Sequence, residues 1–339
     1  MNITNLERTF IIAEIGINHD GSLDKLKKMV DVAAVCGVDA VKLQVMTGYD
    51  LVAGNIPYTF GKGEETYTED LAELFYNRRI KEEWLPLIYD YCKKSGVICF
   101  STPFSEETVD LLETVKNPIY KISSGDITHL PLIDYIARKG KAMIISTGKS
   151  TLADIDDAVR TIRSNNLENF ALLHCISSYP TPYDKLNLRI METLKNSFQC
   201  TVGFSDHSEG YISSVAAVCL GAKIIEKHFT LNKADYGPDH WFSLDPVELK
   251  SLVDNIRIVE KTFGSPLKTV SDIEDKAYLR ASRSIVAARD IETGELFSPE
   301  NLTFKRPGTG IRPKFINIVS GKKAARKFKK DEIITWDDI

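Results

Sequence analysis

Two histidines, His207 and His228, stand within two residues of the ends of short apolar runs, CTVGFS (200–205) and AKIIEK (222–227). If these runs are neighbouring strands of a parallel barrel, both imidazoles meet at one end and could bind one divalent cation. Two histidine ligands leave coordination positions open for substrate and water, which is typical of a catalytic metal site. A single histidine is more often a hydrogen-bonded core residue, but two at adjacent strand ends favour metal binding. Asp206 would then be a candidate to orient an imidazole.

Two lysines, Lys42 and Lys121, each lie near the end of an otherwise apolar run. A buried ammonium is costly unless it meets an anion, and phosphate or carboxylate is the natural partner. A Schiff-base role is the alternative, because burial also lowers the pKa of a lysine. Hydroxyl groups that a phosphate pocket needs accompany the lysines, at Thr102, Ser123, Ser124 and Thr147. The pattern therefore predicts an anionic, phosphorylated ligand.

The remaining apolar runs also end in polar side chains. They are Glu14 with Asn18 and His19, Gln44, Ser101, Ser146, His174, Ser205 and the pair Glu226 and Lys227. Unpaired polar groups inside a barrel cost several kcal/mol each, so they are retained where they are hydrogen-bonded or needed for function. For some of them, Glu14 and His174 above all, the alternative is a hydrogen-bonded layer inside the barrel.

Eight short β-branched runs alternate with longer amphipathic segments, which predicts a parallel (β/α)₈ TIM barrel. A doubly wound sheet is the alternative, but the sequence has neither G-x-G-x-x-G after its first run nor G-x-x-x-x-G-K-[ST] anywhere. The eight runs cover residues 10–17, 39–45, 96–102, 119–123, 142–147, 170–175, 200–205 and 222–227.

The predicted domains are a catalytic barrel over residues 1–265, a linker over 266–280 and a small β-rich module over 281–339. From residue 280 onward the chain has 13 Lys+Arg against 8 Asp+Glu, whereas the rest has 30 against 39. Opposite charges suit a basic module that leans on an anionic ligand or on an acidic domain. An irregular insert at 46–78 follows the second run, and loops of that length are usually functional.

Composition excludes several classes of protein. The chain has 339 residues, 43% of them hydrophobic, a net charge of −4 and six scattered cysteines, which we expect to be reduced core thiols in a cytoplasmic protein. No apolar run approaches the ~20 residues that cross a bilayer, so we expect no membrane segment. The basic stretch at 322–330 lacks aromatic stacking residues or a DNA-binding motif, so we expect a solvated surface and no nucleic-acid partner.

Ten motifs in order over most of the chain resemble the sialic acid synthase family. They are AEIGINHDG (13–21), VKLQ (41–44), STPF (101–104), YKISSGD (120–126), ISTGKS (145–150), LHCISSYPTP (173–182), GFSDHSEG (203–210), EKHFTL (226–231), YGPDHWFSLDP (236–246) and KRPGTGI (305–311). The resemblance implies a TIM barrel followed by a small C-terminal antifreeze-like (SAF, β-clip) domain. It also implies a homodimer in which this domain caps the barrel of the partner subunit.

The activity that the resemblance implies is condensation of phosphoenolpyruvate with an N-acyl hexosamine, giving a nine-carbon 2-keto acid and phosphate. His207 and His228 would hold Mn²⁺ or Mg²⁺, and Glu14 would handle the proton of a water or steady a cation at C2. The implied substrate-binding residues are Lys42, Thr102, Lys121 and Ser124 for phosphoenolpyruvate, Ser177, Tyr179 and Asp239 for the sugar, Ser205 within the same pocket, and Arg306 in the cap of the partner subunit. The resemblance implies cleavage of the carbon–oxygen bond of the phosphoester, which disfavours a Schiff-base role for the lysines.

Ser177 stands where typical N-acetylneuraminate synthases have Asn, which weakens the prediction of N-acetylmannosamine as acceptor. The segment GPDH (237–240) argues against the pseudaminic acid synthases. Legionaminic-type acceptors therefore stay open, and so does the spore-coat polysaccharide synthase branch, which GFSDHSE and the terminal WDDI resemble. A lysine-imine aldolase and a non-catalytic binding protein are more remote alternatives.

Overall fold

The computed structural model describes residues 1–46, 49, 51–62 and 65–339. These residues form two units, Met1–Phe263 and Gly264–Ile339, and each is described by itself. Among the described residues, no helix combines the length and the apolar character needed to cross a membrane.

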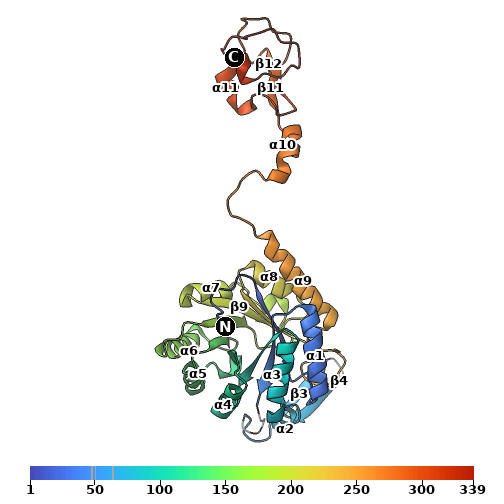
Figure 1. Ribbon diagram of the computed structural model, residues 1–339, viewed down its shortest axis with the longest axis vertical. Helices are drawn as coiled ribbons and strands as arrows, with labels where there is room; N and C mark the ends of the chain where they lie inside the picture. Colours follow the sequence, from blue (N-terminus) through green and yellow to red (C-terminus); the bar gives the residue numbers. More distant parts are fainter. Residues whose placement is uncertain (47–48, 50, 63–64) are drawn as a thin grey trace. The chain divides into compact units, whose positions relative to one another are not determined.

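The first unit contains eight parallel strands that close into a barrel in the order β1-β10-β9-β8-β7-β6-β5-β2, with helices around it (Figure 1). The strands are β1 (Phe10–Gly16), β2 (Ala40–Val45), β5 (Ile98–Pro103), β6 (Ile119–Ile122), β7 (Ala142–Ser146), β8 (Phe170–Cys175), β9 (Thr201–Asp206) and β10 (Ile224–His228). Each predicted run overlaps one of them, and the predicted TIM barrel is confirmed.

Helices connect successive strands, and several begin at side chains that cap their free backbone N–H groups. Capping boxes start α4 at Ser105, α6 at Thr151 and α9 at Asp245. The α-helices of this unit are α1 (Leu23–Cys36), α2 (Leu71–Asn77), α3 (Leu85–Lys94), α4 (Glu106–Thr114), α5 (Leu130–Ala137), α6 (Leu152–Ser164), α7 (Ile190–Phe198), α8 (Ile212–Cys219) and α9 (Pro246–Thr262). Short 3₁₀ helices are η1 (Glu82–Trp84), η2 (Ser124–Asp126) and η3 (Tyr183–Lys185).

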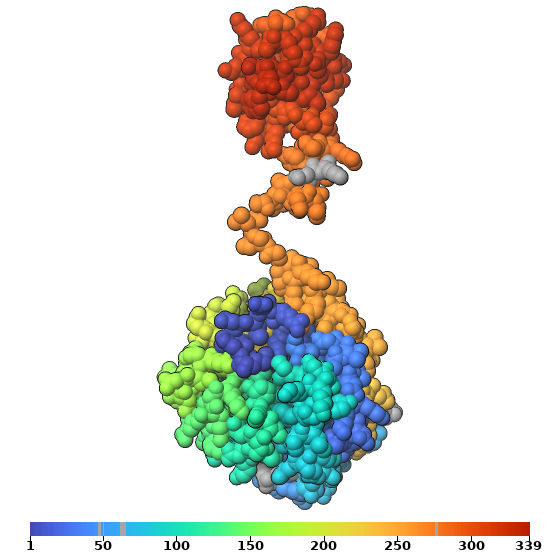
Figure 2. Space-filling model, in the orientation of Figure 1, coloured from blue at the N-terminus to red at the C-terminus, as the bar shows by residue number. Residues whose placement is uncertain are grey.

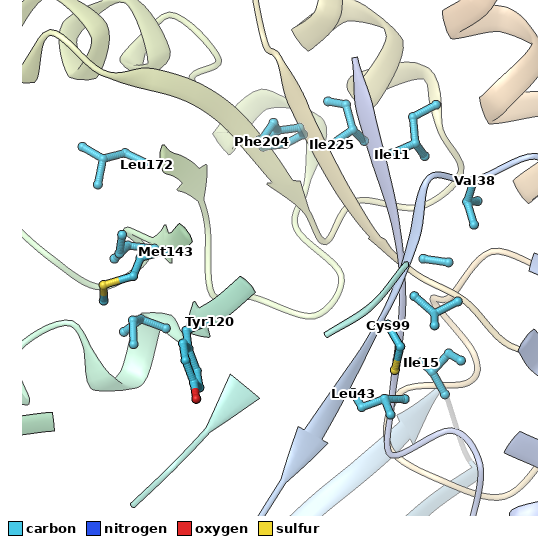
Figure 3. Close-up of a cluster of buried hydrophobic side chains, with 14 of the residues drawn as sticks. Ile11, Ile15, Val38, Leu43, Cys99, Tyr120, Met143, Leu172, Phe204 and Ile225 are labelled. Carbon is cyan, nitrogen blue, oxygen red and sulfur yellow. The ribbon is translucent and has the colours of Figure 1, made fainter. Parts of the chain in front are cut away.

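The alternation of side chains along each strand separates the core from the site. Ile11 and Ile15 of β1 belong to the larger buried cluster, which lies where the strands meet their surrounding helices (Figure 3). Phe10 and Ile12 belong to a second buried cluster. Glu14 continues the Phe10–Ile12 series, so the same alternation that buries those two side chains turns a carboxylate inward at the carboxyl end of β1.

The insert after β2 contains regular structure. Its described part forms an antiparallel hairpin of β3 (Pro57–Lys62) and β4 (Glu65–Asp70), followed directly by α2. The Asp70 side chain accepts hydrogen bonds from the backbone N–H groups of Ala72 and Glu73 and so caps that helix. Residues 47, 48, 50, 63 and 64 of the insert lie outside the described residues.

The second unit has its own hydrophobic core, which includes Ile285, Phe297, Phe328 and Ile334, and Figure 2 shows its C-terminal residues, in red, packed closely against one another. The segment predicted as a linker, 266–280, contains η4 (Asp272–Glu274) and most of α10 (Asp275–Ala281). Its sequence EDKAYLRA is rich in good helix formers, which explains the helical turn. The unit's other elements are β11 (Ser284–Ala287), β12 (Leu302–Lys305), η5 (Pro313–Phe315), α11 (Ile316–Val319) and η6 (Trp336–Asp338).

Candidate active site

A cavity of about 160 Å³ lies at the carboxyl ends of the barrel strands, where the loops after the strands meet. Nine of the twelve predicted site residues line it: Glu14, Lys42, Lys121, Ser124, Ser177, Tyr179, Ser205, His207 and His228. The other lining residues are Gln44, Ser123, Gly125, Ser146, Lys149, Cys175 and Glu226.

The remaining three predicted residues occupy different places. The Thr102 hydroxyl accepts a hydrogen bond from Lys42 Nζ at 3.2 Å, so it contacts a residue that lines the cavity. Asp239 Oδ2 lies 3.8 Å from His228 Nδ1. Arg306 is an exposed residue of the second unit, just after β12, and its role in the cap of a partner subunit stays a prediction.

Strand register explains the charged centre of the cavity. Glu14 on β1 pairs with Lys42 on β2 and with His228 on β10, so three strands bring these side chains side by side. Lys42 Nζ lies 2.9 Å from Glu14 Oε2 and 3.8 Å from Glu226 Oε2. Gln44 Nε2 donates to Glu14 Oε1 at 2.8 Å. The two carboxyl groups therefore share one ammonium.

The pKa values of the two carboxyl groups shift in opposite directions, because the neighbouring lysines act on them unequally. Burial raises the pKa of Glu14, and the charge of Glu226 adds to that rise against the attraction of Lys42. For Glu226, burial acts in the same direction, but Lys121 and Lys42 outweigh it and lower the pKa. Ser205 donates a further hydrogen bond to Glu226 at 3.0 Å. Glu226 is thus the fixed anion, and Glu14 is the carboxyl group better suited to exchange a proton.

The two buried lysines are held differently. For Lys42, burial disfavours the ammonium, but Glu14 and Glu226 outweigh burial and raise the pKa. Lys121 donates hydrogen bonds to Ser146 Oγ and to the Ile122 carbonyl, both at 2.7 Å, and burial lowers its pKa. An anionic ligand beside Lys121 would favour the charged form of this amine.

The two imidazoles face each other with ring centroids 5.4 Å apart. His207 Nδ1 lies 2.9 Å from the Ile176 carbonyl, so in the neutral ring Nδ1 carries the proton and Nε2 keeps its lone pair. Among the described residues, His228 Nδ1 is buried without a hydrogen-bond donor or acceptor. Burial, His207 and Lys42 lower the pKa of His228 well below its usual value, which keeps that imidazole neutral and able to bind a cation.

Aromatic rings close one side of the cavity. The Tyr179 ring lies 4.1 Å from His207 and 5.4 Å from Phe242, measured between centroids. Phe242 lies 5.3 Å from His228. Burial raises the pKa of Tyr179, so its phenol stays protonated and can donate a hydrogen bond. An apolar wall with a phenol is suited to the face and hydroxyl groups of a sugar.

Two predicted polar residues have structural roles. Asp206 points away from the cavity, where its carboxylate lies 3.2 Å from Lys227 Nζ and accepts hydrogen bonds from Ser208 and Ser214. The suggestion that Asp206 orients an imidazole is therefore wrong in this structure, because its carboxylate is engaged on the outer side of the strands. His174 binds the Leu186 carbonyl at 2.6 Å, in keeping with the hydrogen-bonded alternative.

Sequence reasoning gave no specific role to Glu226, Cys175 or Lys149. Glu226 was visible as a strand-end carboxylate, but its pairing with Lys42 depends on barrel register. Cys175, expected as an ordinary core thiol, lines the cavity with Sγ 3.7 Å from His207 Nδ1. Lys149 is an exposed cation at the rim with a left-handed backbone, φ +59°. Its place in the cavity follows from the turn after β7, which the sequence pattern did not resolve.

The cavity lies at the carboxyl ends of the barrel strands, where enzymes with this barrel carry their active sites. The NeuB family model matches residues 29–268 and the SAF domain model matches 282–339. The chain therefore belongs to the NeuB family, carries an antifreeze-like SAF domain at its C-terminal end, and is an enzyme of the transferase class.

Individual relatives agree over nearly the whole chain. N,N'-diacetyllegionaminic acid synthase of Campylobacter jejuni is 40% identical, over 97% of this chain and 99% of the relative. The spore coat polysaccharide biosynthesis protein SpsE of Bacillus subtilis is 39% identical, over 97% and 93%. A crystal structure of N-acetylneuraminic acid synthetase from Leptospira borgpetersenii, in complex with citrate, has a TM-score of 0.71 and 31% identity, over 80% of this chain and 90% of that one.

Proposed function

We propose that this enzyme condenses phosphoenolpyruvate with the open-chain aldehyde of an N-acyl hexosamine, giving a nine-carbon sialic-acid-type 2-keto acid and phosphate. The observation that carries the proposal is the cavity itself. It is lined by two buried lysines, two facing histidines and two carboxyl groups. The names of the relatives, which are synthases of such acids, support it.

Phosphoenolpyruvate brings a phosphate and a carboxylate, and the cavity offers matching donors. Lys42 and Lys121 supply the buried positive charges, and Thr102, Ser124 and Ser205 supply neutral hydroxyl groups beside them. The Gly148 N–H lies 3.0 Å from Ser124 Oγ, and a Cβ added at Gly148 would come within 2.8 Å of that same oxygen. Glycine is therefore needed where the turn after β7 packs closely against the hydroxyl groups of Ser124 and Ser177.

The reaction requires one carbon–carbon bond to form and one carbon–oxygen bond to break. C3 of phosphoenolpyruvate attacks the aldehyde carbon, whose oxygen takes up a proton, and water adds to C2. The resulting intermediate loses phosphate with its bridging oxygen and leaves the 2-keto acid. Glu14, whose pKa is raised by burial, is placed to accept the proton of the attacking water, while Glu226 stays ionised and steadies positive charge at C2.

We also propose that a divalent cation, Mn²⁺ or Mg²⁺, binds at His207 and His228. The donor set fits such an ion, because His207 is fixed with Nε2 free, His228 is neutral, and its buried Nδ1 has no hydrogen-bond partner among the described residues. When bound, the cation would supply Lewis-acid polarisation of the aldehyde oxygen.

The acceptor sugar is proposed to lie against Tyr179, Ser177 and Asp239, with Arg306 of the partner subunit reaching its N-acyl end in a domain-swapped homodimer. N-acetylmannosamine and legionaminic-type diacetamido sugars are both candidates. Ser177 and the 40% identity to a diacetyllegionaminic acid synthase favour the second class.

The test is phosphate release from phosphoenolpyruvate and Mn²⁺ with a panel of N-acyl hexosamines, followed by a mass spectrum of the product. We expect release with at least one acceptor and a product heavier by the pyruvate unit. Silence over a broad panel would refute the proposal. Borohydride trapping of a pyruvate adduct on Lys121 would support the aldolase alternative instead, because only an imine is reduced to a stable bond.

A further inference from the structure

The β3–β4 hairpin packs against the loop that follows β10, through one exposed tyrosine of that loop. The Tyr236 ring lies 5.6 Å from Phe60 and 4.7 Å from Tyr67, both in edge-to-face arrangements. Edge-to-face pairs at these distances stabilise a contact beyond the area that they bury. The hairpin of the insert and the loop after β10 are therefore joined, although they are about 170 residues apart in sequence.

A polar junction fixes the same contact. The Tyr236 hydroxyl donates to Glu69 Oε1 at 2.6 Å. Arg78 donates to both carboxylate oxygens of Glu69 at 3.1 Å, and its guanidinium lies 5.6 Å from the Tyr236 ring centroid. Arg78 is buried, and its hydrogen bonds lower the pKa of Glu69, so this carboxylate stays ionised. Bidentate pairing gives the junction a defined geometry.

The loop held by this junction carries Asp239. Three residues before it stands Tyr236, and the next residue is His240, whose ring lies 2.6 Å from Thr230 Oγ1 and 3.1 Å from Asp20 Oδ1. The Ser243 hydroxyl binds the Asp239 carbonyl at 2.5 Å. Asp239 is therefore held from both sides, with its carboxyl group 3.8 Å from His228 at the cavity.

Tyr58 lies on the face of the hairpin that meets this loop. Its ring stacks on Phe60 at a centroid distance of 6.1 Å. Tyr58 also stands opposite Glu69 in the register of the hairpin, and Phe60 contacts Tyr236, so Tyr58 lies on the hairpin face that meets the loop carrying Asp239. Tyr58 itself is 37% exposed. A partly exposed tyrosine next to a loop that carries a carboxyl group offers a ring face and hydrogen-bonding groups, the combination that a sugar needs.

We propose that the β3–β4 hairpin determines acceptor specificity: Tyr58 contacts the acceptor sugar together with Asp239, and the Tyr236–Glu69–Arg78 junction holds both in place. This inference rests on the proposed function, because it assigns the insert to the sugar half of that reaction. Tyr58 is the contact residue, whereas Tyr236, Glu69 and Arg78 are positioning residues.

The test uses Tyr58→Phe and Tyr236→Phe, which each remove one hydroxyl and keep the ring. The matched control is Tyr91→Phe, because the Tyr91 hydroxyl binds both oxygens of Asp31 at 2.9 Å, on the helix layer of the barrel. Loss of one hydrogen bond corresponds to up to about a tenfold change in affinity. We therefore expect KM for the sugar to rise up to about tenfold in each hairpin-linked variant, with KM for phosphoenolpyruvate unchanged. The control should leave both KM values unchanged.

A second measurement separates contact from positioning. Tyr58→Phe should change the ratio of kcat/KM between two acceptors that differ at one hydroxyl or N-acyl group, whereas Tyr236→Phe should weaken both acceptors alike. Equal rises in KM for sugar and phosphoenolpyruvate, or unchanged KM for the sugar in both variants, would overturn the inference. If the parent enzyme is silent with every acceptor, the proposed function fails instead, so the two failures are distinguishable.

Discussion

Replacing Lys42 with methionine tests whether the buried ion pair at the cavity is retained for function. Lys42 Nζ lies 2.9 Å from Glu14 Oε2, and the two side chains are only 6% and 1% exposed. Removing one partner of such a pair leaves a buried charge without compensation and typically costs about 3–5 kcal/mol. We expect the lower end, about 3 kcal/mol, because Glu14 can take up a proton. Burial already raises its pKa, and loss of Lys42 would raise it further.

The double variant Glu14→Gln/Lys42→Met separates stability from activity. It removes both charges and keeps similar side-chain volumes, so it should regain most of the lost free energy of unfolding. Urea unfolding followed by tryptophan fluorescence provides the assay, because Trp84 and Trp241 both lie in the barrel unit. The same double variant should not bind phosphoenolpyruvate in titration calorimetry, since half of the buried positive charge is absent.

The sign of the pH dependence gives an independent check. In Lys42→Met the deficit should shrink as the pH falls, because a protonated Glu14 no longer leaves a buried charge. The exposed pair of Lys94 and Asp90, 2.6 Å apart, supplies the control, and Lys94→Met should leave stability unchanged. If the two single substitutions at Glu14 and Lys42 are simply additive, or if Lys42→Met is as stable as the parent, the reasoning is refuted.

Three further predictions follow from single side chains. His207→Ala should abolish Mn²⁺ binding measured by calorimetry while the melting temperature stays near that of the parent; unchanged binding would exclude a ligand role. Lys149→Met should raise KM for phosphoenolpyruvate and flatten its dependence on salt, because Lys149 is an exposed cation at the rim; an unchanged salt dependence would contradict this. Burial lowers the pKa of His19 to about 4, below the usual 6.5, so the unfolded chain binds the proton first and the parent loses stability as the pH falls from 6.5 towards 4. His19→Leu should therefore gain about 2 kcal/mol relative to the parent between pH 7.5 and 5 in urea unfolding, whereas the exposed His129→Leu should run parallel to the parent.

The barrel and most of its site follow from local pattern. Strands of a parallel barrel are buried on both faces, so each reads as a short apolar run, and a polar residue at its end stands out against that run. Glu14, Lys42, Lys121, His207 and His228 were recognisable for this reason, and the closed barrel brings them to one cavity.

Features that depend on distant partners could not be predicted in the same way. The insert was recognisable only by its length. The hydrogen bond that joins it to the loop after β10, from Tyr236 to Glu69, connects residues 167 positions apart, and no sequence periodicity predicts such a contact. The different acidities of Glu14 and Glu226 depend on which lysine each one faces, and barrel register decides that. Helix α10 was missed because a short helix between Pro- and Ser-rich stretches has no strong apolar period.

The residues that precede His207 and His228, namely Asp206 and Lys227, contact each other on the side of the strands away from the cavity. Ser205 and Glu226 are paired across β9 and β10 and line the cavity, whereas the next pair, Asp206 and Lys227, forms a buried ion pair at 3.2 Å. His207 and His228 follow that pair directly in sequence, so the ion pair fixes the spacing of the strand ends from which both imidazoles project. A buried ion pair is weak evidence for stability. Its position immediately before both histidines means that it joins the two strand ends that carry them.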